Sequence, residues 1–343
     1  MIKLLSELIS TPSPSKGEEA AADLLEKRMR ERGLEVRRRL NNLWVESEPA
    51  GSKPTVLLNA HIDTVRPAGG YTRDPYAPSL EDGKLYGLGS NDDGGSLVAL
   101  LEAYCILSSR PQPYRLVFSA TAEEEICGPG GIEAIFEDIG PVDFGLIGEP
   151  TGMRMAIAER GLLVLDCKVH GRSGHAAREE GDNAIYKALK SIEWFRSYRF
   201  PLVSEYLGPV KMTVTGINAG TQHNIVPDLC TFMVDIRPNG LYTNEEIVST
   251  VQASCGCEAV PRSLRNNSSS IPTGHPAVQR GLEMGLETFG SPTTSNQTRC
   301  PFTTLKMGPG ESSRSHTADE YILVSEIEEA VDIYVKFLDN LQI

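Results

Sequence analysis

The sequence has no run of about 18 apolar residues, the length that a helix needs to cross a bilayer. Its longest apolar stretch, Ser96–Leu107, is interrupted by Glu102. The amino-terminal stretch carries Glu7 among its apolar residues, unlike the core of a secretory signal peptide. We therefore expect neither a membrane-spanning helix nor a secretory leader.

Positive charge is also scarce. The chain has 33 Lys and Arg residues against 46 Asp and Glu residues, which gives a formal net charge of −13. Proteins that bind nucleic acids or anionic membranes need a basic face. We therefore expect no nucleic-acid partner and no membrane partner.

The cysteines include no Cys-x-x-Cys pair. There are seven, at positions 105, 127, 167, 230, 255, 257 and 300. An odd, scattered set is typical of reduced thiols, and not of a disulfide framework or a thiolate zinc site. The sequence therefore predicts a cytoplasmic location.

The residues that are present indicate a globular α/β protein. Hydrophobic residues make up 40% and charged residues 23%, and the length of 343 residues suggests about two domains. Short apolar strands that run into polar or acidic residues are predicted towards both ends of the chain, at 56–58, 115–119, 144–147 and 304–307.

The middle of the chain has a different pattern. A strand, a helix, two strands and a second helix are predicted at 162–169, 181–197, 210–217, 229–236 and 243–254. This order is close to the ferredoxin-like unit. We expect a discontinuous α/β domain of residues 1–160 and 263–343, with residues 161–262 inserted into it as a second α/β domain.

Residues of metal-binding type follow the predicted strands or lie in a strand-to-helix loop. They are His61, Asp92, Glu124, Glu125, Glu149 and His316. Taken singly, these residues are more simply explained by a turn, a helix cap or a solvated charge run. Ligands of open α/β sheets gather at the carboxyl ends of strands, however, and two histidines with three carboxylates match a dinuclear hydrolytic zinc site. Two Zn²⁺ (+4), three carboxylates (−3) and a bridging hydroxide (−1) sum to zero, which favours burial.

Six motifs occur in order along the chain. They are Asn59-Ala-His61-Ile-Asp63-Thr-Val, Tyr86-Gly-Leu-Gly-Ser-Asn-Asp92-Asp-Gly-Gly, Thr121-Ala-Glu-Glu124-Glu125-Ile-Cys-Gly, Gly148-Glu149-Pro-Thr, Gly174-His175-Ala-Ala and Arg314-Ser-His316-Thr-Ala-Asp-Glu. In these motifs the sequence resembles the dinuclear zinc aminoacylase/carboxypeptidase family, the group of acetylornithine deacetylase and succinyl-diaminopimelate desuccinylase. The residues of these motifs, Leu88-Gly-Ser-Asn-Asp92 among them, most resemble a short-chain branch of the acetylornithine deacetylases. The resemblance implies a zinc-peptidase-like catalytic domain, with a mixed sheet flanked by helices, and an inserted domain that forms a homodimer.

The resemblance also implies five metal ligands. Those of one ion are His61 and Glu149. Those of the other are Glu125 and His316, and Asp92 bridges the pair. The implied cofactor is therefore two Zn²⁺ per chain, for which Co²⁺ can substitute.

Two acidic residues are implied to act beside the ligands. Asp63 would orient His61 by a hydrogen bond, and Glu124 would be the general base that deprotonates the attacking water. The register of the three consecutive glutamates stays open. A slip of one residue would give the roles of base and ligand to Glu123 and Glu124.

The resemblance places further residues near the substrate. His175 would stabilise the tetrahedral oxyanion, often from the partner subunit. Asn224 and Arg237 match positions near the substrate carboxylate, although a structural salt bridge would also explain Arg237. Arg178 and Arg314 are the cations that a succinylated substrate would use.

The activity implied by the resemblance is hydrolysis of the acyl amide of a small N-acyl amino acid. We expect N-acetyl-L-ornithine to be converted to L-ornithine and acetate in arginine biosynthesis. The alternatives are succinyl-ornithine, an acyl-citrulline, succinyl-diaminopimelate or a small peptide as substrate. An inactive dimeric binding module is an alternative of another class.

Overall fold

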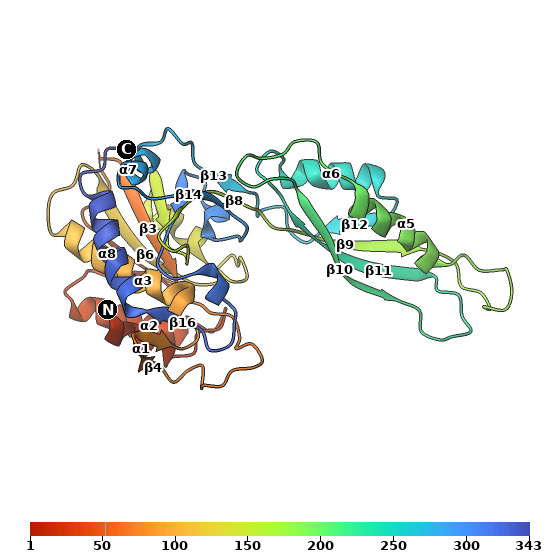
Figure 1. Ribbon diagram of the computed structural model, residues 1–343, viewed down its shortest axis with the longest axis horizontal. Helices are drawn as coiled ribbons and strands as arrows, with labels where there is room; N and C mark the ends of the chain where they lie inside the picture. The colour runs from red at the N-terminus through yellow and green to blue at the C-terminus, as the bar shows by residue number, and fades with distance from the viewer. Residues whose placement is uncertain (52) are drawn as a thin grey trace. The chain divides into compact units, whose positions relative to one another are not determined.

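The computed structural model describes residues 1–51 and 53–343, which form two compact units (Figure 1). The first unit consists of Met1–Ile157, Ser270–Phe289 and Ser295–Ile343. The second consists of Ala158–Ser269 and Gly290–Thr294. The division expected from the sequence, residues 1–160 with 263–343 and residues 161–262, stays a prediction. The sequence pattern does not indicate that a second short segment, Gly290–Thr294, belongs to the second unit.

The main sheet is mixed. Within the described residues its order is β1-β2-β6-β3-β7-β15-β8-β13, and β14 pairs with β8. The strands are β1 (Arg37–Arg39), β2 (Asn42–Glu46), β3 (Thr55–His61), β6 (Arg115–Thr121), β7 (Phe144–Ile147), β8 (Met155–Glu159), β13 (Ser269–Ser270), β14 (Thr288–Ser291) and β15 (Thr304–Lys306). The central strands β6, β3, β7 and β15 are parallel, so their carboxyl ends lie along one edge.

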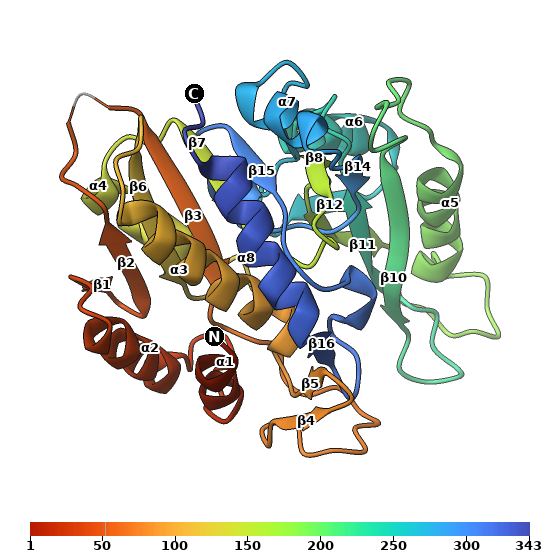
Figure 2. The ribbon, with the colours of Figure 1, turned by 60° about the vertical axis from the view of Figure 1, so that its left-hand side comes forward.

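Helices cover both faces of this sheet, which is why its central strands are continuous apolar runs. Val56, Leu58 and Phe118 pack into the larger core, and Leu57 and Val117 point to the opposite face. Figure 2 shows α8 lying beside α3, and these two helices contact each other. The helices are α1 (Ile2–Ile9), α2 (Glu19–Glu31), α3 (Gly95–Ser108), α4 (Phe136–Ile139), α7 (Pro276–Glu283) and α8 (Val324–Leu338).

A small three-stranded sheet joins the two ends of the first unit. Its order is β16-β5-β4, with β4 (Ser79–Glu81), β5 (Lys84–Tyr86) and β16 (Tyr321–Leu323). Because β16 pairs with β5, the chain just before β16 lies beside the loop that leads from β5 into α3. Both segments carry predicted metal ligands.

The second unit is an antiparallel sheet of order β10-β11-β9-β12 with two helices. Its elements are β9 (Leu163–His170), α5 (Ala184–Ser197), β10 (Lys211–Ala219), β11 (Leu229–Arg237), α6 (Asn244–Ser254) and β12 (Glu258–Pro261). The strand β12 completes the β-α-β-β-α-β order of the ferredoxin-like unit. Residues alternate between buried and exposed along β9, as expected for a sheet with helices on one face.

These observations confirm the predicted α/β class with a mixed sheet flanked by helices. Among the residues that the structure describes, none of the helices combines the length and the apolar character that a bilayer crossing requires.

Candidate metal centre

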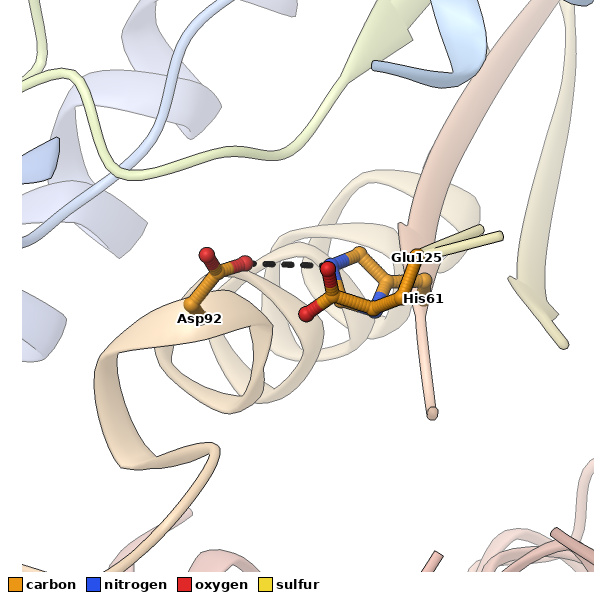
Figure 3. A group of neighbouring side chains, drawn as sticks. All are labelled: His61, Asp92 and Glu125. Atoms are coloured by element: carbon orange, nitrogen blue, oxygen red, sulfur yellow. Dashed lines mark hydrogen bonds and ion pairs between the residues drawn. The ribbon is translucent and has the colours of Figure 1, made fainter. Parts of the chain in front are cut away.

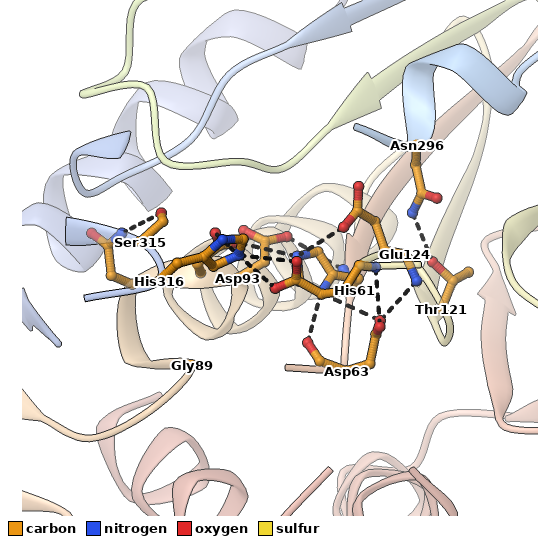
Figure 4. Close-up of polar contacts among 12 residues, drawn as sticks. His61, Asp63, Gly89, Asp93, Thr121, Glu124, Asn296, Ser315 and His316 are labelled. Atoms are coloured by element: carbon orange, nitrogen blue, oxygen red, sulfur yellow. Dashed lines mark hydrogen bonds and ion pairs between the residues drawn. The ribbon is translucent and has the colours of Figure 1, made fainter. Parts of the chain in front are cut away.

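The carboxyl ends of the parallel strands collect the predicted ligands at one edge of the main sheet. His61 is the last residue of β3 and pairs with Thr121, the last residue of β6. Glu124 and Glu125 follow β6, and Glu149 follows β7. Figure 4 shows the group of polar side chains that results. Sequence segments far apart in the chain therefore meet at one point.

His61, Asp92 and Glu125 form a compact group (Figure 3). Their ligand atoms lie within 4.8 Å of one another, and Asp92 Oδ1 lies 3.1 Å from His61 Nε2. His61 Nδ1 lies 2.8 Å from the main-chain oxygen of Asp63, so Nδ1 donates there and Nε2 faces the group. Burial alone would lower the pKa of His61, but the hydrogen bonds with Asp63 and Asp92 raise it well above its ordinary value. The neighbouring carboxylates therefore favour positive charge at this position, which a divalent cation would also supply.

Asp63 ties together the segments that carry the ligands. Its Oδ1 accepts a hydrogen bond from the main-chain N–H of Glu124 at 3.0 Å, and its Oδ2 accepts one from that of Glu125 at 3.1 Å. The hydroxyl of Ser15 donates to Oδ2 at 2.7 Å. Asp63 therefore contacts His61 through its main-chain oxygen and the glutamate loop through its carboxylate, and the carboxylate oxygen Oδ1 lies 3.5 Å from His61 Nδ1.

Glu124 and Glu149 form a second group with His61. The ligand atoms of the three residues again lie within 4.8 Å of one another, and Glu124 Oε2 lies 3.9 Å from His61 Nε2. Both glutamates are buried, and burial raises the pKa of each carboxyl well above its ordinary value. Repulsion from the Asp92 carboxylate raises both pKa values further. Protonation of the Glu124 and Glu149 carboxyls, or a nearby cation, would relieve this repulsion.

His316, in the carboxyl-terminal part of the chain, lies next to Glu125 and Asp92. Its Nε2 lies 3.0 Å from Glu125 Oε2 and 3.8 Å from Asp92 Oδ2. The hydrogen bond with Glu125 raises the pKa of His316 to about 9. Asp92 thus lies between the two imidazoles, as a bridging ligand would.

Glu123 lies outside this group. Its Oε2 accepts a hydrogen bond from the main-chain N–H of Gly130 at 3.2 Å. The placement favours Glu124 as base and Glu125 as ligand over the register in which both roles move back by one residue.

Sequence reasoning missed two residues that hold the centre in place. One is Ser15, which binds Asp63 as described above. The other is Glu320, which is buried and accepts hydrogen bonds from the loop of Asp92. Burial raises the pKa of Glu320 to about 7. Glu320 is the last residue of the motif that begins at Arg314. Its role could not be predicted from the sequence, because hydrogen bonds from a carboxylate to backbone N–H groups produce no characteristic residue spacing.

The donor set fits divalent zinc. Zinc is bound in hydrolytic sites by imidazole nitrogen and carboxylate oxygen, which are the donors gathered here. Four carboxylates share the site with two imidazoles, namely Asp92, Glu124, Glu125 and Glu149 with His61 and His316. An excess of negative charge away from water is costly unless a cation compensates it. The arrangement can therefore hold metal ions and keep a separate carboxylate for proton transfer.

Arg314 lies in the first unit and is already paired. Its Nη1 and Nη2 donate to the two carboxylate oxygens of Glu326 at 2.7 and 3.0 Å. The guanidinium also lies over the ring of Tyr321, 4.6 Å from its centroid. A substrate carboxylate would have to compete with Glu326 for this side chain.

The other predicted substrate residues lie in the second unit. Arg237 donates to both oxygens of Asp235, at 2.8 and 3.0 Å, which is the salt bridge left open by the sequence. His175 and Asn224 are exposed and lie on adjacent segments, where Ala176 N–H donates to the main-chain oxygen of Asn224 at 2.9 Å. Arg178 is exposed, with Nη1 3.9 Å from Glu180 Oε1.

Comparison with known proteins identifies the family. A model of peptidase family M20/M25/M40 matches residues 57–340, which is most of the chain. The chain belongs to this family. It is therefore a hydrolase, and the predicted resemblance to the group of deacetylases and desuccinylases is confirmed.

Individual family members match nearly the whole chain. The acetylornithine deacetylase of Proteus mirabilis is 29% identical over 376 residues, which cover 99% of this chain and 96% of that protein. The succinyl-diaminopimelate desuccinylase of Wolbachia pipientis is 24% identical, with 99% and 92% covered. The crystal structure of a Staphylococcus aureus tripeptidase superposes with a TM-score of 0.79 at 20% identity, covering 98% of this chain and 96% of that chain. This last likeness shows that the M20-family fold is shared.

Proposed function

We propose that this protein is a metal-dependent amidohydrolase that removes the acetyl group of N-acetyl-L-ornithine. The products are L-ornithine and acetate, as in arginine biosynthesis. The observation that carries the proposal is the group of two imidazoles and four carboxylates at the carboxyl edge of the main sheet. The similarity to acetylornithine deacetylase over nearly the whole chain supports the choice of substrate.

The chain's own side chains account for metal binding. In the proposal His61 and Glu149 hold one Zn²⁺, Glu125 and His316 hold the other, and Asp92 bridges them. Bound ions supply Lewis acidity for the amide carbonyl and for the attacking water. Metal analysis of the active protein is expected to find about two zinc ions per chain, and chelation should abolish activity.

Glu124 is the proposed general base. Its carboxyl is buried within 3.9 Å of His61 Nε2, and it is not among the proposed ligands. Burial raises the pKa of this carboxyl, which suits a group that takes a proton from water and holds it near neutral pH. Glu124 then returns that proton to the nitrogen of the leaving amine as the C–N bond breaks. The acyl product is the carboxylic acid, whose own proton passes to the amine to give acetate and the ammonium form of ornithine.

The acetyl group is favoured over succinyl by charge. With two zinc ions the formal charge is −13 + 4 = −9, a field that favours a cationic ornithine side chain over a second carboxylate. A succinyl carboxylate would need a cation in the site. Arg314 is neutralised by Glu326, and Arg237 by Asp235.

We further propose that the protein forms a homodimer through the second unit. We also propose that it is located in the cytoplasm, a compartment that keeps thiols reduced. The exposed His175 supports this proposal, because an oxyanion donor in the inserted unit of one chain could serve its partner. None of the seven cysteines in the described part of the chain forms a disulfide.

A hydrolysis panel tests the substrate. Zinc-loaded protein is assayed with N-acetyl-ornithine, succinyl-ornithine, acetyl-citrulline, succinyl-diaminopimelate and a dipeptide, and we expect kcat/KM to be highest for the first. A succinyl compound hydrolysed at least about tenfold faster would overturn the acyl-group choice. Absence of turnover on any amide, with zinc bound, would favour the binding-module alternative.

A further inference from the structure

Asp92 lies in a loop between β5 and α3. Gly87 and Gly89 in this loop have positive φ values of 147° and 75°, so the chain turns sharply there. A Cβ at Gly87 would lie 2.4 Å from the Ile9 side chain, which shows that the turn is packed against α1. The backbone N–H groups of such a buried loop need acceptors from elsewhere in the chain.

The side chain of Glu320 accepts three hydrogen bonds from backbone N–H groups of this loop. Its Oε1 accepts from the N–H groups of Asn91 at 2.8 Å and Asp92 at 2.9 Å, and its Oε2 accepts from Gly89 N–H at 3.0 Å. The main-chain oxygen of Glu320 also accepts from Gly87 N–H at 2.9 Å. Glu320 is 2% exposed, so these hydrogen bonds are shielded from water.

A second contact joins the same two segments. Asn91 Nδ2 donates to the main-chain oxygen of Glu311 at 3.1 Å, and Glu311 N–H donates to Asn91 Oδ1 at 3.0 Å. The backbone that leads into Asp92, up to the N–H of Asp92 itself, is therefore attached to the segment that carries His316. This arrangement leaves the Asp92 side chain 3.1 Å from one imidazole and 3.8 Å from the other.

We propose that Glu320 is a positioning residue that fixes the backbone of Asp92, so that its carboxylate lies between His61 and His316 before any ion binds. This inference rests on the proposed metal-dependent function. Glu320 itself touches neither imidazole in this scheme, and acts only through the loop. Groups that orient metal ligands typically contribute about 10–100-fold to metal affinity.

The test compares Glu320→Gln with Glu46→Gln, a matched substitution at a glutamate whose side chain is 10% exposed. Glu46 lies in the same unit and pairs with the buried Arg115 at 2.8 Å, on a strand that meets β6 away from its carboxyl end. Both substitutions replace one carboxylate oxygen by an amide group and leave the length of the side chain unchanged. In Glu320→Gln, an amide NH₂ replaces one acceptor oxygen and faces a backbone N–H that it cannot accept from.

Two quantities are measured on chelator-treated protein. Zinc affinity is obtained by competition with a chromophoric chelator, and the melting temperature of the metal-free chain is obtained by circular dichroism. We expect Glu320→Gln to lose about 10–100-fold in zinc affinity while its metal-free melting temperature is no lower than that of Glu46→Gln. Glu46→Gln should keep wild-type zinc affinity.

The outcomes separate this inference from the proposed function. Wild-type protein that binds no zinc would refute the proposed function itself. Wild-type protein that binds zinc and hydrolyses its substrate, beside a Glu320→Gln chain of unchanged affinity, would overturn only the role of Glu320. Should Glu320→Gln fail to fold, Glu320→Asp keeps the charge but is shorter by one methylene. Failure of both chains to fold without metal would make Glu320 a general stabilising residue and overturn the proposal.

Discussion

Glu124 and Glu125 are neighbours in the chain with different contacts. Glu125 binds His316 at 3.0 Å, whereas Glu124 is buried near His61. We expect Glu124→Gln to keep its zinc and lose about 10²–10⁴-fold in kcat, since it removes a base. Glu125→Gln should lose zinc instead.

Metal content and single-turnover rates of both chains check this expectation. Glu123→Gln is the matched control, because its carboxylate binds Gly130 outside the centre. An exchange of the two phenotypes would mean that the roles are assigned in the wrong register.

The metal-free protein should lose stability as the pH rises from about 6 to 9. The pKa of Glu320 is raised from 4.5 to about 7 by burial, so its contribution to folding falls as the pH rises through that range. The pKa of His316 is raised from 6.5 to about 9 by Glu125, so its contribution is full below pH 6.5 and is lost through pH 9. The raised pKa values of His61, Glu124 and Glu149 act in the same direction.

Melting temperatures of chelator-treated protein at pH 6 and pH 9 test this dependence. Zinc should stabilise the protein more at the higher pH, because ions compete with protons for the same ligands. A metal-free chain that melts at a higher temperature at pH 9 would show that the cluster does not control the pH response.

At the residue scale, sequence could predict groups whose chemistry is in their side-chain type and in their position after a strand. His61 and Glu149 are examples, because a parallel sheet brings the residues after its strands to one edge. Glu320 and Ser15 could not be found in this way. Their roles are hydrogen bonds to a backbone loop and to a carboxylate, and both depend on a turn that only the folded chain defines.

The contact between α3 and the sheet depends on small residues beside the ligands. A Cβ at Gly148 would lie 2.6 Å from Ser96 Cβ and 2.9 Å from a methyl group of Leu100, both on α3. Gly148→Ala must therefore push α3 away from β7 or displace the next residue, Glu149. We expect a loss of about 1–3 kcal/mol in unfolding free energy and weaker zinc binding.

Chemical denaturation and zinc titration of Gly148→Ala give both quantities. Gly274→Ala is the control, since a Cβ at Gly274 meets no atom within 4 Å. Equal stability and equal zinc affinity in the two chains would show that α3 can shift without disturbing the metal centre.

At the element scale, strands with a continuous apolar or alternating pattern were predictable and strands without one were not. The predicted strands at 115–119 and 144–147 correspond to β6 and β7, which are buried along their whole length because both faces are covered. The two-residue β13 and the four-residue β12 and β14 were not predicted. These strands are only partly buried, unlike the equally short β7, and their pairing is set by neighbours that are distant in sequence.

For the whole molecule, His175 is the residue that links the second unit to catalysis in our proposal. Its Nδ1 accepts a hydrogen bond from Ala177 N–H at 3.1 Å, so the neutral ring carries its proton on Nε2. That exposed N–H is the donor that an oxyanion requires. We expect His175→Ala to keep its zinc and its fold and to lose about 10²–10³-fold in kcat.

Hybrid dimers tell whether His175 acts across the interface. Chains with His175→Ala and chains with Glu124→Gln are mixed under conditions that exchange subunits. Action across the dimer predicts recovered activity, because one site of the hybrid has both residues intact. Verified hybrids without activity would place His175 in the site of its own chain, and an unchanged kcat in the single variant would leave it with no catalytic role.

The insertion of the second unit also sets an order of events on the ribosome. β7 must wait for its parallel neighbour β15, since Ile147 pairs with Lys306 and the whole second unit is translated between them. Until then the nascent first unit has an unpaired strand edge, which is prone to aggregate, while the nearly contiguous second unit can fold as soon as it emerges. His316 and Glu320 leave the ribosome later still. In our proposal His316 holds one of the two ions, so that ion can bind to its complete site only after the segment around residue 316 has been made.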